Sequence, residues 1–125
     1  NQMKVLYFGE PIPEILVEGN KNSTFRVCDS QNIRQGDLIS FLLPDDTPFA
    51  EVQCTGTKMT RFEDLTPEDW EGHERFPSDV KMFEIYSNWE KRPITKSDSV
   101  KIIRFEYRTF CRDAVLEYLG RDRSE

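Results

Sequence analysis

Residues 19–26 read Gly19-Asn20-Lys21-Asn22-Ser23-Thr24-Phe25-Arg26, which places a Gly-Asn pair, two basic side chains and two hydroxyl groups in one short stretch. The apolar segment Ile12–Val17 precedes this stretch. Because glycine readily adopts the left-handed backbone that ends helices, the pattern predicts a helix that stops at Gly19 and a strand that starts near Ser23. Lys21 and Thr24 would then lie close together at the start of a strand, where they are candidates for chemistry.

Five segments have the β-branched, aromatic or alternating composition that is typical of strands. They are Lys4–Phe8, Ser23–Cys28, Leu38–Leu43, Phe49–Thr57 and Ser99–Tyr107. In the fourth segment the alternation places Ala50, Val52 and Cys54 on one face, which we expect to be buried. Turn signals at Gly36-Asp37 and Pro44–Pro48 separate the middle segments.

The sequence also predicts helices between and after the strands. A short helix follows the first strand and contains Ile12–Val17. Thr66–Asp69 and Pro77–Asp79 each combine a capping residue, a proline and an acidic residue, so each is predicted to start a helix in an insertion before the last strand. A helix that starts at Thr109 is expected to end at Gly120.

The order of these segments predicts the fold class. In the second helix of the insertion, Phe83, Tyr86 and Trp89 have the spacing of a face that packs on a core. We therefore expect an α+β fold, a small β-barrel of about five to six strands with a helix after the first strand and a helical insertion before the last.

The charge of the chain limits the partners that it can bind. The net charge is −6 at pH 7, which disfavours duplex DNA because binding to a duplex depends on neutralising its phosphates. Residues 62–90 hold nine acidic and two basic side chains, whereas residues 91–123 hold nine basic and five acidic ones. The acidic total favours a small substrate over long RNA, although the basic C-terminal part could still contact one nucleotide or a short RNA.

Neither a membrane span nor an export signal is predicted. No apolar run approaches the roughly 18 residues that a span needs. The first residues lack the basic and apolar regions of a signal peptide, so we expect a cytoplasmic protein.

Metal and disulfide chemistry are not predicted either. Cys28, Cys54 and Cys111 match no zinc or disulfide spacing, and we expect them to be reduced, small and partly buried. His73 is the only histidine in the chain, so we predict no metal site and no other cofactor.

Gly19-x-Lys21-x-x-Thr24-x-Arg26 resembles the GxKxxTxR signature of the ASCH domain family, whose fold is PUA-like. Ile33–Ile39 is similar to the I-x-x-G-D-x-I turn and strand of that family. Phe62–Thr66 resembles its segment after the barrel, and Val100–Glu106 resembles its closing strand. The resemblance covers about residues 4–106, so we expect residues 1–125 to form a single domain with that core and a C-terminal extension at 107–125.

The resemblance implies a cleft beside the signature that binds RNA or a modified nucleotide. One bacterial branch of small ASCH proteins consists of amidohydrolases that remove the acetyl group from N4-acetylcytidine. By similarity to that branch, the catalytic residues would be Lys21, Thr24 and a glutamate of the insertion. That glutamate aligns most naturally with Glu74, and Glu71 is the alternative.

Residue chemistry is compatible with these roles. A metal-free amide hydrolase needs a nucleophile, a base to activate it and a donor for the oxyanion. Thr24 and a partly buried Lys21 can supply the first two, and Glu74 could orient the lysine and pass a proton to the leaving amine. Arg26 would share a strand face with Thr24 and could hold a phosphate or a carbonyl group. With Arg26, the expected substrate-binding residues are Gly19 and Trp70, the latter as a stacking surface for a base.

Each candidate also has a purely structural interpretation. Thr24 is common in strands for packing reasons, and Lys21 in a Gly-Asn turn would normally be solvated. Arg26 could pair with an acid across the sheet, Glu74 could belong to a solvated helix face, and His73 could be a surface or capping residue. The sequence therefore leaves open catalysis or binding alone, the acyl group, and the oligomeric state.

Overall fold

The computed structural model describes residues 3–123, and it describes side chains as far as residue 120. One five-stranded sheet has the order β1-β3-β4-β5-β2. Only β1 and β3 run parallel; the other neighbouring strands are antiparallel. The strands are β1 (Lys4–Tyr7), β2 (Ser23–Arg26), β3 (Leu38–Leu42), β4 (Pro48–Arg61) and β5 (Ser99–Phe110).

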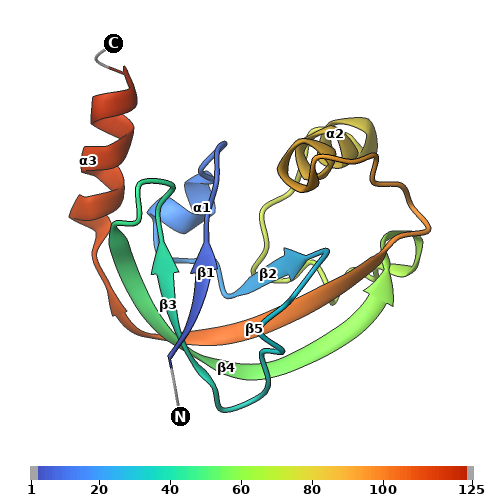
Figure 1. Cartoon of the computed structure of the whole chain (residues 1–125), viewed down its shortest axis with the longest axis horizontal. Coiled ribbons are helices and arrows are strands. Elements are labelled where there is room, and N and C mark those ends of the chain that lie inside the picture. The colour runs from blue at the N-terminus through green and yellow to red at the C-terminus, as the bar shows by residue number, and fades with distance from the viewer. Residues whose placement is uncertain (1–2, 124–125) are drawn as a thin grey trace.

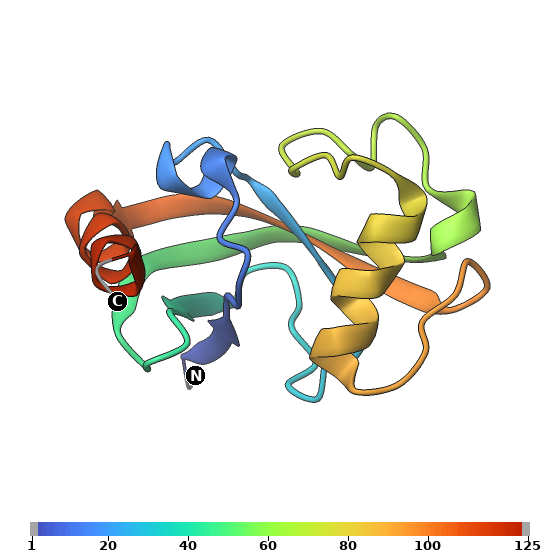
Figure 2. The same ribbon diagram turned by 90° about the horizontal axis from the view of Figure 1, so that it is seen from above.

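The sheet curves into a half-barrel that carries three helices (Figure 1), which confirms the expected α+β, PUA-like small barrel. The long strands β4 and β5 form its floor. The helices α2 (Asp79–Glu90) and α3 (Arg112–Arg123) lie near opposite ends of these strands, as the view from above also shows (Figure 2). The short helix α1 (Glu14–Val17) lies between them, on the side of the sheet that faces α2.

The strands β4 and β5 extend further than predicted. β4 continues four residues past Thr57 to Arg61, and β5 continues three residues past Tyr107 to Phe110. The added part of β4 is mostly exposed and polar, so it lacks the alternation that marks a strand in the sequence. The predicted inner face of β4 is confirmed, because Ala50, Val52 and Cys54 are all buried.

The predicted helix at Thr66 is wrong. A single turn of 3₁₀ helix (Phe62–Asp64) and a series of turns occupy this region instead. The Asp69 carboxylate accepts from the Thr66 backbone N–H at 3.0 Å and from Lys58 at 2.9 Å. Gly72 then adopts a left-handed backbone with φ of +74°, which stops helical continuation.

The second helix of the insertion is confirmed as α2. The Ser78 hydroxyl caps it by accepting from the Lys81 backbone N–H at 3.1 Å. Only part of the predicted core stripe is buried. Tyr86 is buried and Phe83 is half-buried, whereas Trp89 is 40% exposed.

Two expectations for the C-terminal part are wrong. The last helix begins at Arg112, because Thr109 is still paired with Glu51 in the sheet. It also runs through Gly120, since one glycine costs a helix only about 1 kcal/mol.

Cys28 and Cys111 are exposed, so only Cys54 has the predicted burial.

The core consists of two hydrophobic clusters. The first cluster lies among β1, β3 and α3 and includes Ile39, Phe41 and Val115. The second cluster lies under α2 and comprises Phe25, Phe62, Met82, Tyr86, Ile94, Val100 and Ile102. The candidate site lies where residues of both clusters come close together.

Candidate functional site

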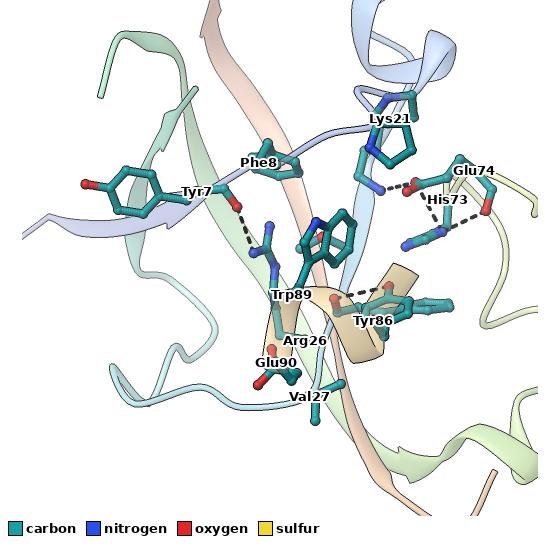
Figure 3. A pocket seen from close by; sticks show the side chains of 15 residues that line it. Tyr7, Phe8, Lys21, Arg26, Val27, His73, Glu74, Tyr86, Trp89 and Glu90 are labelled. Carbon is teal, nitrogen blue, oxygen red and sulfur yellow. Dashed lines mark hydrogen bonds and ion pairs between the residues drawn. The ribbon is translucent and has the colours of Figure 1, made fainter. Parts of the chain in front are cut away.

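A cavity of about 250 Å³ lies between β2, α2 and the segment that follows β1 (Figure 3). Lys21, Thr24, Arg26 and Glu74 all line it, so four of the six predicted site residues come together. The other lining residues are Tyr7, Phe8, Gly9, Pro11, Pro13, Phe25, Val27, His73, Tyr86, Trp89 and Glu90.

Gly19 and Trp70 do not line this cavity. Gly19 has a φ of +73° and directs the chain from α1 toward β2, and a Cβ atom there would face Phe110 at 3.4 Å. Trp70 packs edge-on against Phe25 and His73, with ring centroids 5.0 and 5.5 Å away. Trp70 therefore supports the wall of the site from behind, whereas Gly19 sets only the direction of the chain.

Lys21 is buried, with a relative exposure of 1%. Its backbone N–H donates to the Ile15 oxygen at 3.2 Å, so the turn after α1 folds back and directs the side chain inward. Lys21 Nζ donates to Glu74 Oε1 in a short ion pair. Burial lowers the pKa of Lys21 to about 8, although the Glu74 carboxylate acts in the opposite direction.

Glu74, and not Glu71, is the acid that pairs with Lys21. Burial by itself would raise the pKa of Glu74, but the charge of Lys21, the neighbouring His73 and the hydrogen bonds to the carboxylate together outweigh this and lower it. Glu74 is therefore a carboxylate at neutral pH. Glu71 is exposed, and its backbone oxygen rather than its side chain contacts β2.

His73 is buried beside this ion pair. Its ring stacks on Phe25, with centroids 3.8 Å apart. Nδ1 lies 2.8 Å from the Glu74 backbone oxygen and 3.2 Å from Glu74 Oε1, so the proton of the neutral ring belongs on Nδ1. Burial and the charge of Lys21 lower the pKa of His73 to about 3. At neutral pH the ring is uncharged and too weak a base to accept a proton.

Backbone contacts hold the loop that supplies His73 and Glu74. The Gly72 oxygen accepts from the backbone N–H of Asn22 at 2.9 Å and of Ser23 at 3.3 Å. Arg104 on β5 donates to the backbone oxygen of Glu68 at 2.6 Å and to that of Glu71 at 3.3 Å. The loop is thus fixed to β2 and β5 directly before Glu74.

Thr24 lines the cavity and is buried, with a relative exposure of 4%. Its hydroxyl makes no hydrogen bond within the described part of the chain, and in particular none to Lys21. Lys21 and Thr24 therefore share a cavity, while the lysine contacts Glu74.

The aromatic and acidic residues contributed by α2 were missed by the sequence-based prediction. Tyr86, Trp89 and Glu90 line the cavity, and burial raises the pKa of Tyr86. The helical spacing of Tyr86 and Trp89 indicated only a face that packs on the core. The one signal that could have singled out Trp89 and Glu90 is their position in the last turn of the helix, where side chains are less completely buried.

A wider groove of about 790 Å³ adjoins the cavity. The two share Pro11, Pro13, His73, Glu74 and Trp89 in their linings. The groove runs between α1 and α2 and has carboxylates on the α1 side and basic residues, Arg75 and Lys81, on the other. It can hold the part of a ligand that extends out of the cavity.

Among the side chains that the structure describes, those of residues 3–120, no group of three His, Cys, Asp or Glu residues is arranged to hold a metal ion. No helix in that range is long and apolar enough to cross a bilayer.

No family model matches the chain, and no curated protein matches its sequence. Solved structures do match. The ASCH domain from Lactobacillus crispatus JV V101 has a TM-score of 0.59 at 10% identity over 83% of this chain and 79% of that chain. Protein EF3133 from Enterococcus faecalis V583, described as DUF984, has a TM-score of 0.58 at 12% identity over 78% and 69% of the two chains.

A mutant of the ASCH protein ZmASCH from Zymomonas mobilis is also similar, with a TM-score of 0.51 at 15% identity over 90% of this chain and 76% of that chain. At such low identities the similarity concerns the fold. The fold suggested by the Lys21-x-x-Thr24 signature is confirmed, and the chain has the ASCH-like fold of these proteins.

Proposed function

We propose that this protein hydrolyses the amide bond of a small N-acylated pyrimidine nucleoside such as N4-acetylcytidine. The observation that carries the proposal is the buried Lys21–Glu74 pair in the wall of a cavity that Thr24 also lines. A lysine with a lowered pKa beside a carboxylate is typical of functional sites, because it exchanges protons near neutral pH.

The proposed reaction has two steps. Thr24 Oγ1 attacks the acyl carbon while its proton passes to the neutral form of Lys21. The C–N bond then breaks, and the exocyclic nitrogen of cytosine takes up a proton from the Lys21–Glu74 pair. In the second step water attacks the threonine ester with Lys21 again as base, which releases acetate and restores the hydroxyl group.

His73 has a positioning role in this proposal. Since the ring is neutral, it adds no charge to the site. Its contacts with Glu74 through Nδ1 and with the ring of Phe25 orient the carboxylate toward Lys21.

The test is to incubate the pure protein with N4-acetylcytidine and follow the loss of the acetyl group by chromatography. Lys21→Ala, Thr24→Ala and Glu74→Ala are each expected to lower kcat/KM at least 100-fold. Thr55→Ala, an exposed threonine on β4, is the matched control and should retain full activity. No turnover by the wild type would refute the deacetylase assignment. Full turnover by Thr24→Ala would refute the assignment of Thr24 as the nucleophile.

One observation favours an alternative in which the cavity only binds a nucleotide or a short RNA. Lys21 donates to Glu74 and makes no hydrogen bond to Thr24 among the described residues, so a base in contact with the nucleophile is not preformed. Under this alternative, short single-stranded RNA binds at low salt with an affinity that falls as salt rises, and N4-acetylcytidine is not turned over. Absence of RNA binding at low salt would exclude it.

A further inference from the structure

On the other side of the cavity from Glu74, Arg26 presents a guanidinium group that has no acidic partner within the described chain (Figure 3). Nη1 donates to the Tyr7 backbone oxygen at 2.8 Å, and Cζ lies 4.8 Å from the ring centroid of Phe8. No carboxylate of residues 3–120 lies within ion-pair distance of Arg26, although Glu90 also lines the cavity.

These contacts fix the guanidinium and leave part of it available. Nε is enclosed and has no acceptor, whereas Nη2 makes no hydrogen bond to the described residues and is not enclosed. Hydrogen bonds from a charged guanidinium are stronger than those between neutral groups, so a ligand oxygen that accepts from Nη2 would be bound strongly. The backbone oxygen of Tyr7 and the ring of Phe8 hold the group in place before a ligand arrives.

The spacing of Thr24 and Arg26 along β2 suggests what kind of molecule can contact both residues. Thr24 and Arg26 are two residues apart on one strand, so their Cα atoms are separated by roughly 7 Å and their side chains share a face. One pyrimidine ring spans such a separation. Trp89 lines the cavity and is 40% exposed, so it provides a flat apolar surface for one face of the ring.

We infer that Arg26 recognises the 2-keto oxygen of a cytosine ring whose acylated 4-amino group lies at Thr24 and Lys21. The inference rests on the proposed function and narrows its substrates to N-acylated cytosines. In a cytosine ring the 2-keto oxygen and the 4-amino group flank N3 on one edge, so a single ring whose edge lies along β2 can contact both Arg26 and Thr24. N-acylated adenine has no keto group and would lack this contact.

The first experiment measures binding and does not require turnover. Cytosine and 4-aminopyrimidine, which lacks the keto oxygen, are titrated into the wild type and into Arg26→Gln and Arg26→Lys by calorimetry. We expect the wild type to bind cytosine about 10–100-fold more tightly than 4-aminopyrimidine, as for a charge-assisted hydrogen bond. In Arg26→Gln this preference should fall to less than about three-fold, and Arg26→Lys should be intermediate because lysine keeps the charge without the planar group.

Arg108→Gln is the matched control, because Arg108 is exposed on β5 and does not line the cavity. It should keep the wild-type preference. The inference is overturned if the wild type binds both ligands equally or binds neither, or if folded Arg26→Gln keeps the full preference. If Arg26→Gln does not fold, the ratio of the affinities for cytosine and 4-aminopyrimidine is compared between the wild type and Arg26→Lys. An equal ratio in these two proteins would then overturn the inference.

The second experiment separates this inference from the proposed function. N4-acetylcytosine and N-(pyrimidin-4-yl)acetamide are compared as substrates of the wild type, and each rate is divided by the rate of alkaline hydrolysis of the same amide. A keto preference in binding without any turnover would refute the hydrolase and retain the Arg26 contact. Turnover of both amides with equal corrected rates would retain the hydrolase and refute the Arg26 contact.

Discussion

The cluster at the α3 end of the sheet and the cluster at the α2 end differ in the side chains buried beside them. All members of the first cluster are apolar, including Ile39 and Val115. The buried polar or charged residues of the described chain all lie close to the second cluster, in residues 21–24 and 69–73: Lys21, Ser23, Thr24, Asp69 and His73.

This difference shows that the two ends stabilise the protein in different ways. Apolar burial contributes about 25 cal/mol per Å² and needs no partner. A buried charge lowers stability unless it is paired and hydrogen-bonded, so Lys21 depends on Glu74. The α3 end is therefore stabilised by apolar burial alone, whereas the α2 end gives up some stability to hold polar and charged groups in a buried cavity.

Truncation in the first cluster should have the largest effect on stability. Ile39 is fully buried on β3, so Ile39→Ala should lower the free energy of unfolding by roughly 3–4 kcal/mol. The activity of the folded molecules should not change, because Ile39 does not line the cavity. Urea denaturation and kcat/KM per folded molecule measure the two effects, with Ile39→Val as the mild control. A ten-fold loss of kcat/KM in Ile39→Ala would show that the two ends are not separable.

Removal of the acid at the α2 end should have the next largest effect. Glu74→Ala leaves Lys21 buried without its partner, so we expect a loss of about 3 kcal/mol, together with the loss of activity. Lys21→Met combined with Glu74→Gln removes both charges and should regain most of that stability without regaining activity. Equal stability of the single and the double variant would show that the pair does not balance a buried charge.

A backbone change at Gly72 should have a smaller effect. A Cβ atom there would lie 1.6 Å from Asn22 Oδ1, and the φ of +74° disfavours any other residue. Gly72→Ala should cost about 2 kcal/mol and lower kcat/KM about ten-fold, because the loop would carry Glu74 away from Lys21. Gly36 is the matched control, with a φ of +94° and open space around it, so Gly36→Ala should show the backbone cost alone. Equal effects of the two variants on kcat/KM would contradict a positioning role for Gly72.

Local signals in the sequence were sufficient for most of the fold. Gly19 and the alternation of Phe49–Thr57 placed the end of α1 and the inner face of β4 correctly. The helix predicted at Thr66 failed because Lys58, distant in sequence, holds the Asp69 carboxylate in a turn. The end of α3 was missed because packing of Val115 decides whether a helix tolerates Gly120.

The candidate site was harder to predict because its geometry depends on contacts between distant segments. The signature identified Lys21, Thr24 and Arg26 through local spacing, and these side chains do share a cavity. The resemblance favoured Glu74 and left Glu71 as the alternative, because the choice is made by hydrogen bonds from β2 and β5 to the backbone of the loop. The predicted contact of Trp70 with a ligand was not found at this cavity, because stacking within the second cluster occupies the ring.

The pH dependence of Lys21 gives the smallest of the expected effects. Its pKa of about 8 in the folded protein lies below the ordinary value of 10.5, so the unfolded chain binds more protons between pH 8 and 10.5. The free energy of unfolding should therefore rise with pH across that window. Because the neutral lysine accepts the proton of Thr24, kcat/KM should rise about ten-fold between pH 7 and pH 9. Glu74→Gln removes the charge that raises the pKa of Lys21, so the midpoint of its residual activity should move below pH 8. A midpoint that stays in place or moves upward would show that the titration belongs to a group other than Lys21.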